Sequence, residues 1–175
     1  MISILQVPHP VKLFIGMLTQ DVALFGQLGE ELKDIFGPVD MESHIWDWEH
    51  TDYYSKEMGA DLKRKFVFFE NLIDPGAISG IKLKTIEFEK QYKNKTGGRR
   101  INLDPGYLDS AKIVLVSTKD FSHRIYLGNG IYGEVTVIYS GKNYQILPFT
   151  YPDFRTPEYL NVFREAREKY KQQIK

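Results

Sequence analysis

The sequence predicts an α+β fold, and three features of its hydrophobic pattern support this prediction. Strand-like runs alternate with two segments of helical periodicity in the first hundred residues, a glycine-rich turn separates two later strands, and the chain closes with an amphipathic segment. In order, the first elements read β-α-β-β-α-β, the split βαβ (ferredoxin-like) arrangement, which implies a mixed or antiparallel sheet. A C-terminal β-hairpin extension and a final helix complete a single α+β domain over residues 1–175.

The first strand and helix are predicted from the hydrophobic pattern of residues 11–36. Residues 11–18 carry one charge, Lys12, which favours a strand buried on both faces. Apolar residues then recur at helical spacing up to Phe36, and Gly37 ends this helix because glycine is favoured directly after a helix. Residues 39–48 alternate between apolar and polar side chains and predict a half-buried strand.

The next elements are another strand, a capped helix and a turn. Residues 65–70 are dominated by phenylalanine and valine and predict a strand. Asp74 as N-cap, with proline after it, begins a helix whose apolar stripe runs to Tyr92 and which Gly97 and Gly98 close. The run Asp104-Pro105-Gly106 predicts a turn between strands, so the following strand is expected at residues 112–118.

The last part of the chain predicts a hairpin and a helix. Residues 123–127 are expected to pair with residues 131–139 across a Gly-Asn-Gly turn. A short strand near residues 144–147 precedes a helix capped by Thr156. The inward stripe of that helix is Tyr159, Val162, Phe163, Ala166 and Tyr170.

Composition excludes several classes of protein. The 175 residues carry 23 basic and 23 acidic side chains, 42% are hydrophobic, and none is cysteine. These values exclude a disordered chain, a collagen-like repeat, thiol catalysis and zinc-thiolate sites. No uncharged apolar run approaches the ~20 residues of a membrane-spanning helix, so we expect a cytoplasmic protein with no membrane partner. No cofactor or oligomeric state is indicated.

Charge is unevenly distributed along the chain. Residues 21–61 have a net charge of −9, and residues 82–100 have a net charge of +5. The basic stretch is expected to pair with the acidic half, and the alternative is a patch for phosphate or nucleic acid. The motifs GxxxxGK[ST], GxGxxG, HExxH and GxSxG are all absent, so the common nucleotide-binding and hydrolase signatures are missing.

Polar and reactive side chains gather between residues 102 and 155. His123 and Glu134, with Asp120 nearby, are the candidate catalytic residues, because a carboxylate beside a histidine orients the ring for acid–base chemistry. A two-residue hairpin loop would place His123 opposite Glu134 or Thr136, and a three-residue loop would place it opposite Val135. The candidate ligand-binding residues are Asn102, Asp104, Lys119, Arg124, Thr136, Asp153 and Arg155.

This cluster allows three interpretations. Lys119, Arg124 and Arg155 could hold a small anionic or phosphorylated ligand, with arginine giving a bidentate grip. Alternatively, a hard divalent metal could be bound by the carboxylates of the cluster together with its histidine; this set is Asp104, Asp120, His123 and Glu134. The third interpretation is a buried polar network that fixes the hairpin against the sheet.

Two other functions are compatible with the pattern. Residues 13–18 resemble the shorter motif of the RNA-recognition domain, with Phe14 at the base-stacking position, but Arg64 replaces an aromatic residue of the longer motif. This interpretation predicts an exposed Phe14. Trp46 and Trp48 could instead anchor a protein partner in a non-catalytic interaction domain, which requires exposed indole rings.

The sequence is similar to a family of prokaryotic proteins designated domain of unknown function 4416. The resemblance covers essentially the whole chain, and its most specific segments are residues 102–106, 117–120, 123–127, 130–136 and 150–155. These segments coincide with the polar cluster, which implies that the cluster matters to the family. The resemblance implies no catalytic assignment.

Overall fold

The structure is a computed structural model that describes residues 6–49, 54–95 and 97–175. Its elements confirm the α+β class. In chain order they are β1 (Val11–Thr19), α1 (Ala23–Phe36), β2 (Val39–Glu42), β3 (Trp46–Asp47), α2 (Ser55–Met58), β4 (Lys63–Ile73), η2 (Pro75–Ala77), α3 (Ile78–Gln91), β5 (Ile101–Leu108), β6 (Lys112–Ser117), β7 (Ile125–Gly128), β8 (Ile131–Ser140), β9 (Asn143–Ile146), η3 (Asp153–Arg155) and α4 (Pro157–Gln173).

The strands of the described residues form one large antiparallel sheet. Its order is β2-β4-β1-β5-β6-β8-β7, with β3 paired to β4 and β9 paired to β8. All nine residues of β1 are buried. The prediction that residues 11–18 form a strand covered on both faces is therefore confirmed.

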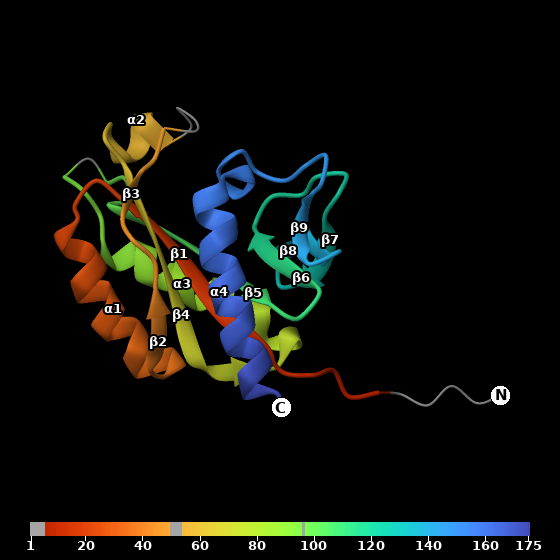
Figure 1. The fold of residues 1–175 in the computed structure, drawn as a ribbon. Helices are drawn as coiled ribbons and strands as arrows, with labels where there is room; N and C mark the ends of the chain where they lie inside the picture. Colours follow the sequence, from red (N-terminus) through yellow and green to blue (C-terminus); the bar gives the residue numbers. More distant parts are fainter. Residues whose placement is uncertain (1–5, 50–53, 96) are drawn as a thin grey trace.

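Helices cover both faces of the sheet (Figure 1). On one face, α1 and α3 pack against Leu13, Ile15 and Met17 of β1. On the other face, α4 packs against Phe14. Because side chains alternate along a strand, β1 contributes to both hydrophobic cores.

The burial of Phe14 contradicts the RNA-recognition hypothesis. Phe14 is fully buried, and its ring centroid lies 4.8 Å from that of Phe163 on α4. A base cannot stack on this ring while α4 covers it. The prediction of an exposed Phe14 was wrong because the final helix closes the sheet face that RNA-recognition domains use for stacking.

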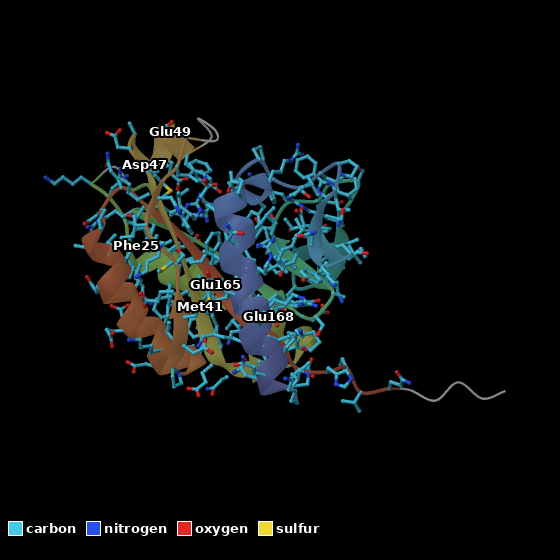
Figure 2. The ribbon with its side chains drawn as sticks, in the orientation of Figure 1. Phe25, Met41, Asp47, Glu49, Glu165 and Glu168 are labelled. Atoms are coloured by element: carbon cyan, nitrogen blue, oxygen red, sulfur yellow. The ribbon has the colours of Figure 1, made fainter. Side chains whose placement is uncertain are left out.

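The start and the amphipathic pattern of α4 were predicted from the sequence. The Thr156 side chain accepts a hydrogen bond from the Tyr159 N–H, which caps the helix. Four of the five predicted stripe residues are buried and Val162 is partly buried. Glu165 and Glu168 are exposed on the outer side of α4 (Figure 2).

The segment Asp104-Pro105-Gly106 lies inside β5 and is not a turn. Pro105 pairs with Ile15 of β1, and Gly106 pairs with Leu115 of β6. Gly106 is also the first residue of β5 that pairs with β6. Proline has no N–H for a ladder hydrogen bond, and the pairing of β5 with β6 ends beside it. The two strands are therefore unpaired between Ile101 and Pro105.

The predicted strand 39–48 is divided into two short strands that both pair with β4. Trp48 follows the second of these strands and is buried, and Trp46 is partly buried. Trp46 packs on Tyr159 of α4 with a centroid distance of 5.0 Å. The two indole rings are thus not the exposed anchors that the interaction hypothesis requires.

The hairpin loop is Asn129-Gly130, but the predicted register was wrong. Gly128 pairs with Ile131, and a bulge before Gly128 shifts the remaining pairs so that Ile125 lies opposite Gly133. His123 precedes the strand. Its contact with Glu134 is made by side-chain reach and not by strand pairing.

In the described part of the chain, no helix has both the length and the apolar character needed to cross a membrane.

Candidate functional site

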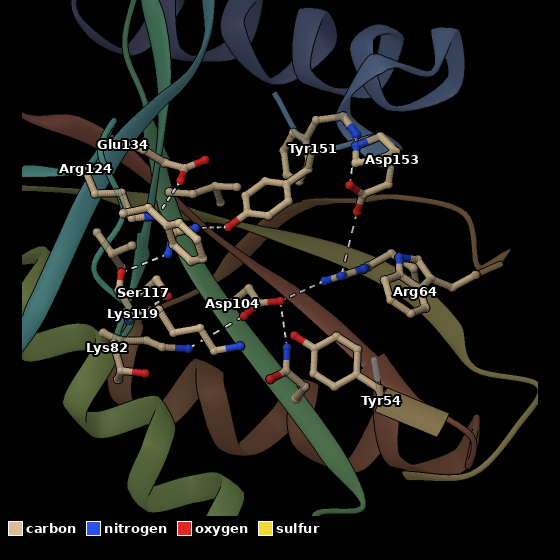
Figure 3. A pocket seen from close by; sticks show the side chains of 18 of the residues that line it. Tyr54, Arg64, Lys82, Asp104, Ser117, Lys119, Arg124, Glu134, Tyr151 and Asp153 are labelled. Atoms are coloured by element: carbon tan, nitrogen blue, oxygen red, sulfur yellow. Dashed lines mark hydrogen bonds and ion pairs between the residues drawn. The ribbon is translucent and has the colours of Figure 1, made fainter. Parts of the chain in front are cut away.

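A cavity of about 530 Å³ opens where β5 and β6 separate. This volume lies within the range of small-molecule sites, about 300–1,000 Å³. Figure 3 shows the side chains that reach into it from β4, α3, β5, β8 and the segment before α4. The lining residues are Trp48, Tyr54, Arg64, Phe66, Lys82, Arg99, Asn102, Asp104, Leu115, Val116, Ser117, Thr118, Lys119, Phe121, Arg124, Glu134, Tyr151, Pro152, Asp153 and Phe154.

Asp104 of β5 lies at the centre of this cavity (Figure 3). Its Oδ2 accepts hydrogen bonds from Arg64 Nη1 at 3.2 Å and from Asn102 Nδ2 at 2.7 Å. Its Oδ1 lies 3.7 Å from Lys82 Nζ. Lys82 belongs to α3, and it also donates a hydrogen bond to the Leu103 carbonyl at 2.7 Å. One carboxylate therefore faces two cations from two different elements.

Arg64 is a deeply buried cation of the cavity. Its side chain is 5% exposed, and its guanidinium carbon lies 5.8 Å from the ring centroids of both Trp48 and Phe66. Arg64 Nη2 lies 3.8 Å from Asp153 Oδ2. Among the described residues, Arg64 Nε is buried without a hydrogen-bond partner, although buried polar atoms normally have one.

Electrostatic interactions keep both Asp104 and Arg64 in their charged forms. Burial opposes the charge of Asp104, but Lys82 and Arg64 together hold the pKa of Asp104 below its usual value. Burial likewise disfavours the charged form of Arg64, and Asp104 and other neighbours outweigh it, so the pKa of Arg64 is raised. The cavity floor is therefore a preformed arrangement of fixed charges.

Arg99 lines the cavity, and its guanidinium group is hydrogen-bonded to two carboxylates. Its Nε and Nη2 donate to the two carboxylate oxygens of Glu57, each at 2.8 Å. Its Nη1 donates to Glu89 at 3.2 Å and to Asn102 Oδ1 at 2.8 Å. Chiefly the hydrogen bonds to Glu57, with the charge of Glu89 in addition, raise the pKa of Arg99. Arg99 thus fixes Asn102, which in turn contacts Asp104.

The basic stretch 82–100 pairs in part with the acidic stretch, as expected. Arg99 contacts Glu57, and Arg100 Nη2 lies 2.7 Å from Asp21 Oδ2. These contacts support the pairing interpretation of the basic stretch over an open nucleic-acid patch.

Arg124 joins the opposite walls of the cavity (Figure 3). Its Nε donates to Glu134 Oε2 at 2.7 Å, its Nη1 donates to the Lys119 carbonyl at 2.8 Å, and its Nη2 donates to the Tyr151 hydroxyl. Burial, together with the negative charge of Glu134, raises the pKa of Tyr151 to about 12. Arg124 therefore connects three chain segments at the mouth of the cavity.

Of the candidate catalytic residues, Glu134 lines the cavity, whereas His123 and Asp120 do not. His123 Nε2 lies 3.0 Å from Glu134 Oε2, and its ring stacks on Phe149 with a centroid distance of 4.5 Å. Asp120 is exposed. The predicted contact between His123 and Glu134 is present, but only the carboxylate of the pair reaches the cavity.

The candidate ligand-binding residues fall into two groups. Five of them line the cavity: Asn102, Asp104, Lys119, Arg124 and Asp153.

Thr136 and Arg155 lie outside the lining. Thr136 donates a hydrogen bond to Glu134 at 3.5 Å. Arg155 donates to the carbonyls of Thr150 at 2.7 Å and Pro148 at 3.2 Å. These last two bonds hold the backbone of the segment before α4 in place, so Arg155 has a structural role here.

The divalent-metal interpretation is not realised in the structure. Among the described residues, no group of three or more His, Asp or Glu side chains is arranged to hold a metal ion. His123 contacts Glu134, but the carboxylates of Asp104 and Glu134 are each paired with cations, Asp104 with Arg64 and Lys82 and Glu134 with Arg124.

Sequence reasoning missed most of the cavity's cations and rings. Arg64 was noted only as a departure from an RNA-binding motif, and Lys82 only as part of a basic stretch. The available signal was one arginine, Arg64, beside an apolar strand and one lysine, Lys82, within a helix, because such residues are almost never fully buried unless paired. Tyr151 lies in the segment 150–155 that resembles the family, but neither it nor Tyr54 was predicted to line a site.

The sequence model of one family, described as "Domain of unknown function (DUF4416)", matches residues 9–170. No curated protein and no solved structure matches the chain. The matched range includes every residue that lines the cavity.

Proposed function

The chain belongs to the DUF4416 family, and from the chemistry of its cavity we propose that it binds a small anionic ligand there. The observation that carries this proposal is Arg64. Its guanidinium group is buried and hydrogen-bonds to Asp104 through Nη1, its Nη2 lies 3.8 Å from Asp153 Oδ2, and among the described residues its Nε has no hydrogen-bond partner. A guanidinium group has five N–H donors, so an oxyanion in the cavity would supply acceptors that the protein does not.

The charge of the lining supports the same proposal. Five cationic side chains line the cavity against three carboxylates, so a bound anion would meet an excess of positive charge. The cationic residues are Arg64, Lys82, Arg99, Lys119 and Arg124.

These five cations have different roles. Arg99 and Arg124 are engaged by protein acceptors on each of their nitrogens. Arg64 and Lys82 are therefore the residues proposed to hold the anion, with Asp104 keeping both in place. Lys119 lines the same cavity and is proposed to add positive charge there.

If the ligand is processed, Glu134 is the proposed acid–base group, because it lines the cavity. His123 contacts the same carboxylate oxygen as Arg124. We assign His123 to positioning Glu134, since its ring lies outside the cavity lining.

Calorimetric titration with inorganic phosphate, glycerol 3-phosphate and citrate tests the proposal. Wild-type protein is expected to bind at least one of these anions, and a ligand at 100 times its Kd should add about 2.7 kcal/mol to the unfolding free energy. Lys119→Ala is expected to weaken binding about tenfold or more, because a charge-assisted contact contributes about 1.5–3 kcal/mol. Lys119 is exposed, so this variant should fold.

Lys90→Ala is the matched control. Lys90 is also exposed, pairs with Glu87 and is absent from the cavity lining. Its substitution should leave anion affinity unchanged. Equal losses in the two variants, or no binding of any of the three anions to the wild type, would contradict the proposal.

We also propose that residues 11–108 form a split βαβ (ferredoxin-like) unit. The strand order β2-β4-β1-β5 with antiparallel neighbours supports it, as do α1 between β1 and β2 and α3 between β4 and β5. An experimental structure with another order of these four strands would overturn it.

A further inference from the structure

One large apolar side chain lies exposed at the rim of the cavity. Phe121 lines the cavity and is 56% exposed. It follows β6 in the segment that leads to Arg124. An apolar ring that stays this exposed to water would gain favourably from being covered by a ligand.

The ring of Phe121 is held in a defined position. The Arg124 guanidinium carbon lies 5.0 Å from its centroid. The His123 ring stacks against it at 6.1 Å with an interplanar angle of 26°, and Phe149 also stacks on His123, with an angle of 4°. Because Glu134 contacts both Arg124 and His123, it fixes the two neighbours of Phe121 together.

Aromatic side chains also line the rest of the cavity. Tyr54 and Tyr151 are only partly covered, and Trp48 lies beside Arg64. Figure 3 shows Tyr54 and Tyr151 facing the cavity from opposite sides of Asp104. A ligand in this space would therefore contact ring faces and edges as well as cations.

We propose that the ligand is an oxyanion attached to a planar aromatic ring, and that the ring packs against Phe121 while Arg64 and Lys82 hold the anion. This inference rests on the proposed function, because it specifies the ligand of the same cavity. Planar rings gain from offset or edge-on contact with a fixed phenyl ring in a way that saturated rings of similar size do not. The site therefore selects for planarity as well as for charge.

A comparison of phenyl phosphate, cyclohexyl phosphate and inorganic phosphate by calorimetric titration tests this selection. The first two carry the same phosphate on rings of similar size, and the cyclohexyl ring is not planar. The wild type is expected to bind phenyl phosphate about five- to tenfold more tightly than cyclohexyl phosphate, the factor that an aromatic contact supplies. Burial of apolar area alone would give cyclohexyl phosphate equal or higher affinity.

Phe121→Leu keeps an apolar side chain and removes the ring. It should abolish the preference for phenyl over cyclohexyl phosphate and leave the affinity for inorganic phosphate unchanged. Tyr126→Leu is the control, because Tyr126 is similarly exposed, at 59%, and lies outside the cavity lining. It should retain the full preference.

The outcomes separate the two proposals. Equal binding of the phenyl and cyclohexyl esters to the wild type, or a preference that survives Phe121→Leu, would overturn the aromatic inference while anion binding stands. Failure of all three phosphates to bind would overturn the aromatic inference, and it would overturn the proposed function as well if citrate and glycerol 3-phosphate also fail.

Discussion

Arg64 of β4 reaches Asp104 of β5 across the intervening strand β1, with 3.2 Å between Nη1 and Oδ2. The residue beneath this contact is Gly16, which pairs with Phe66 on one side and with Asp104 on the other. A Cβ at Gly16 would lie 3.0 Å from Arg64 Nη1 and 2.9 Å from Phe66 Cε1. The missing side chain of one residue therefore leaves room for the central ion pair of the cavity.

We expect Gly16→Ala to destabilise the protein by about 1–3 kcal/mol, the usual cost of overpacking a filled core. Phe66 is buried and packs on Tyr159 with a centroid distance of 4.9 Å, so it cannot move aside freely. Urea unfolding followed by circular dichroism measures the change. An unfolding midpoint equal to that of the wild type would show that this close approach carries no strain.

The ion pair also predicts a dependence of stability on pH. Because the pKa of Asp104 is lower in the folded state than its ordinary value of 3.8, the unfolded state binds more protons below that pH. The stabilisation from ionised Asp104 is thus complete above pH 3.8 and is lost as the pH falls through the folded pKa. We expect the stability difference between wild type and Asp104→Asn to shrink across that window in urea titrations.

Glu89 serves as a control, because its contribution to folding stability is expected to change with pH in the direction opposite to that of Asp104. Burial raises the pKa of Glu89 above its ordinary value of 4.5, so the folded state binds the proton more tightly. The stabilisation from protonated Glu89 is complete below pH 4.5 and is lost as the pH rises through the folded pKa. Wild type should therefore lose stability relative to Glu89→Gln as the pH rises through this window. Parallel pH profiles for the two variants would contradict both assignments.

Local pattern predicted α1, α3, α4 and most strands, because their signals are complete within a few residues, and it missed the short helix α2. Thr156 caps α4 and the buried stripe of that helix follows from its spacing alone. The prediction of a turn at Asp104-Pro105-Gly106 was wrong because the composition of this segment is that of a turn. Its strand conformation depends on β1, more than eighty residues earlier in the chain, and no local pattern contains that partner.

The candidate site was predictable only in part for a similar reason. Asp104, Lys119, Arg124, Glu134 and Asp153 lie in one stretch of polar sequence, and the fold brings them to one cavity. Arg64 and Lys82 come from elements that the sequence assigned to packing and to a solvated face. Their role arises from the separation of β5 from β6, which is a property of the assembled sheet.

Glycine substitutions can test the strand assignment of Gly106. A Cβ at this position would lie 2.5 Å from both Phe14 Cζ and the Val114 carbonyl oxygen. Because a backbone atom cannot be displaced by rotamer change, we expect Gly106→Ala to cost at least about 1–3 kcal/mol. Thermal and urea unfolding report this loss.

Gly80 of α3 is the matched comparison. A Cβ there would meet no atom within 4 Å. Gly80→Ala should therefore stabilise the protein by about 0.5–1 kcal/mol, the ordinary gain from replacing glycine inside a helix. A loss of stability in this variant would contradict the open surroundings of Gly80, and a neutral Gly106→Ala would contradict the pairing of β5 with β6.

The contacts of Glu134 predict which of its two neighbours depends on it more. Arg124 is 4% exposed at its side chain and has Glu134 as its carboxylate partner, whereas His123 is 17% exposed and also stacks on Phe149. Removing one member of a buried ion pair costs about 3–5 kcal/mol, because the other charge is left uncompensated. We expect a loss of this size for Glu134→Gln and a smaller loss, about 0.5–1.5 kcal/mol, for His123→Leu, which removes a single hydrogen bond.

Urea unfolding of the two variants and their double mutant measures both losses and the coupling between the sites. If His123→Leu proved as costly as Glu134→Gln, the histidine and not the arginine would be the partner that fixes this carboxylate at the cavity wall.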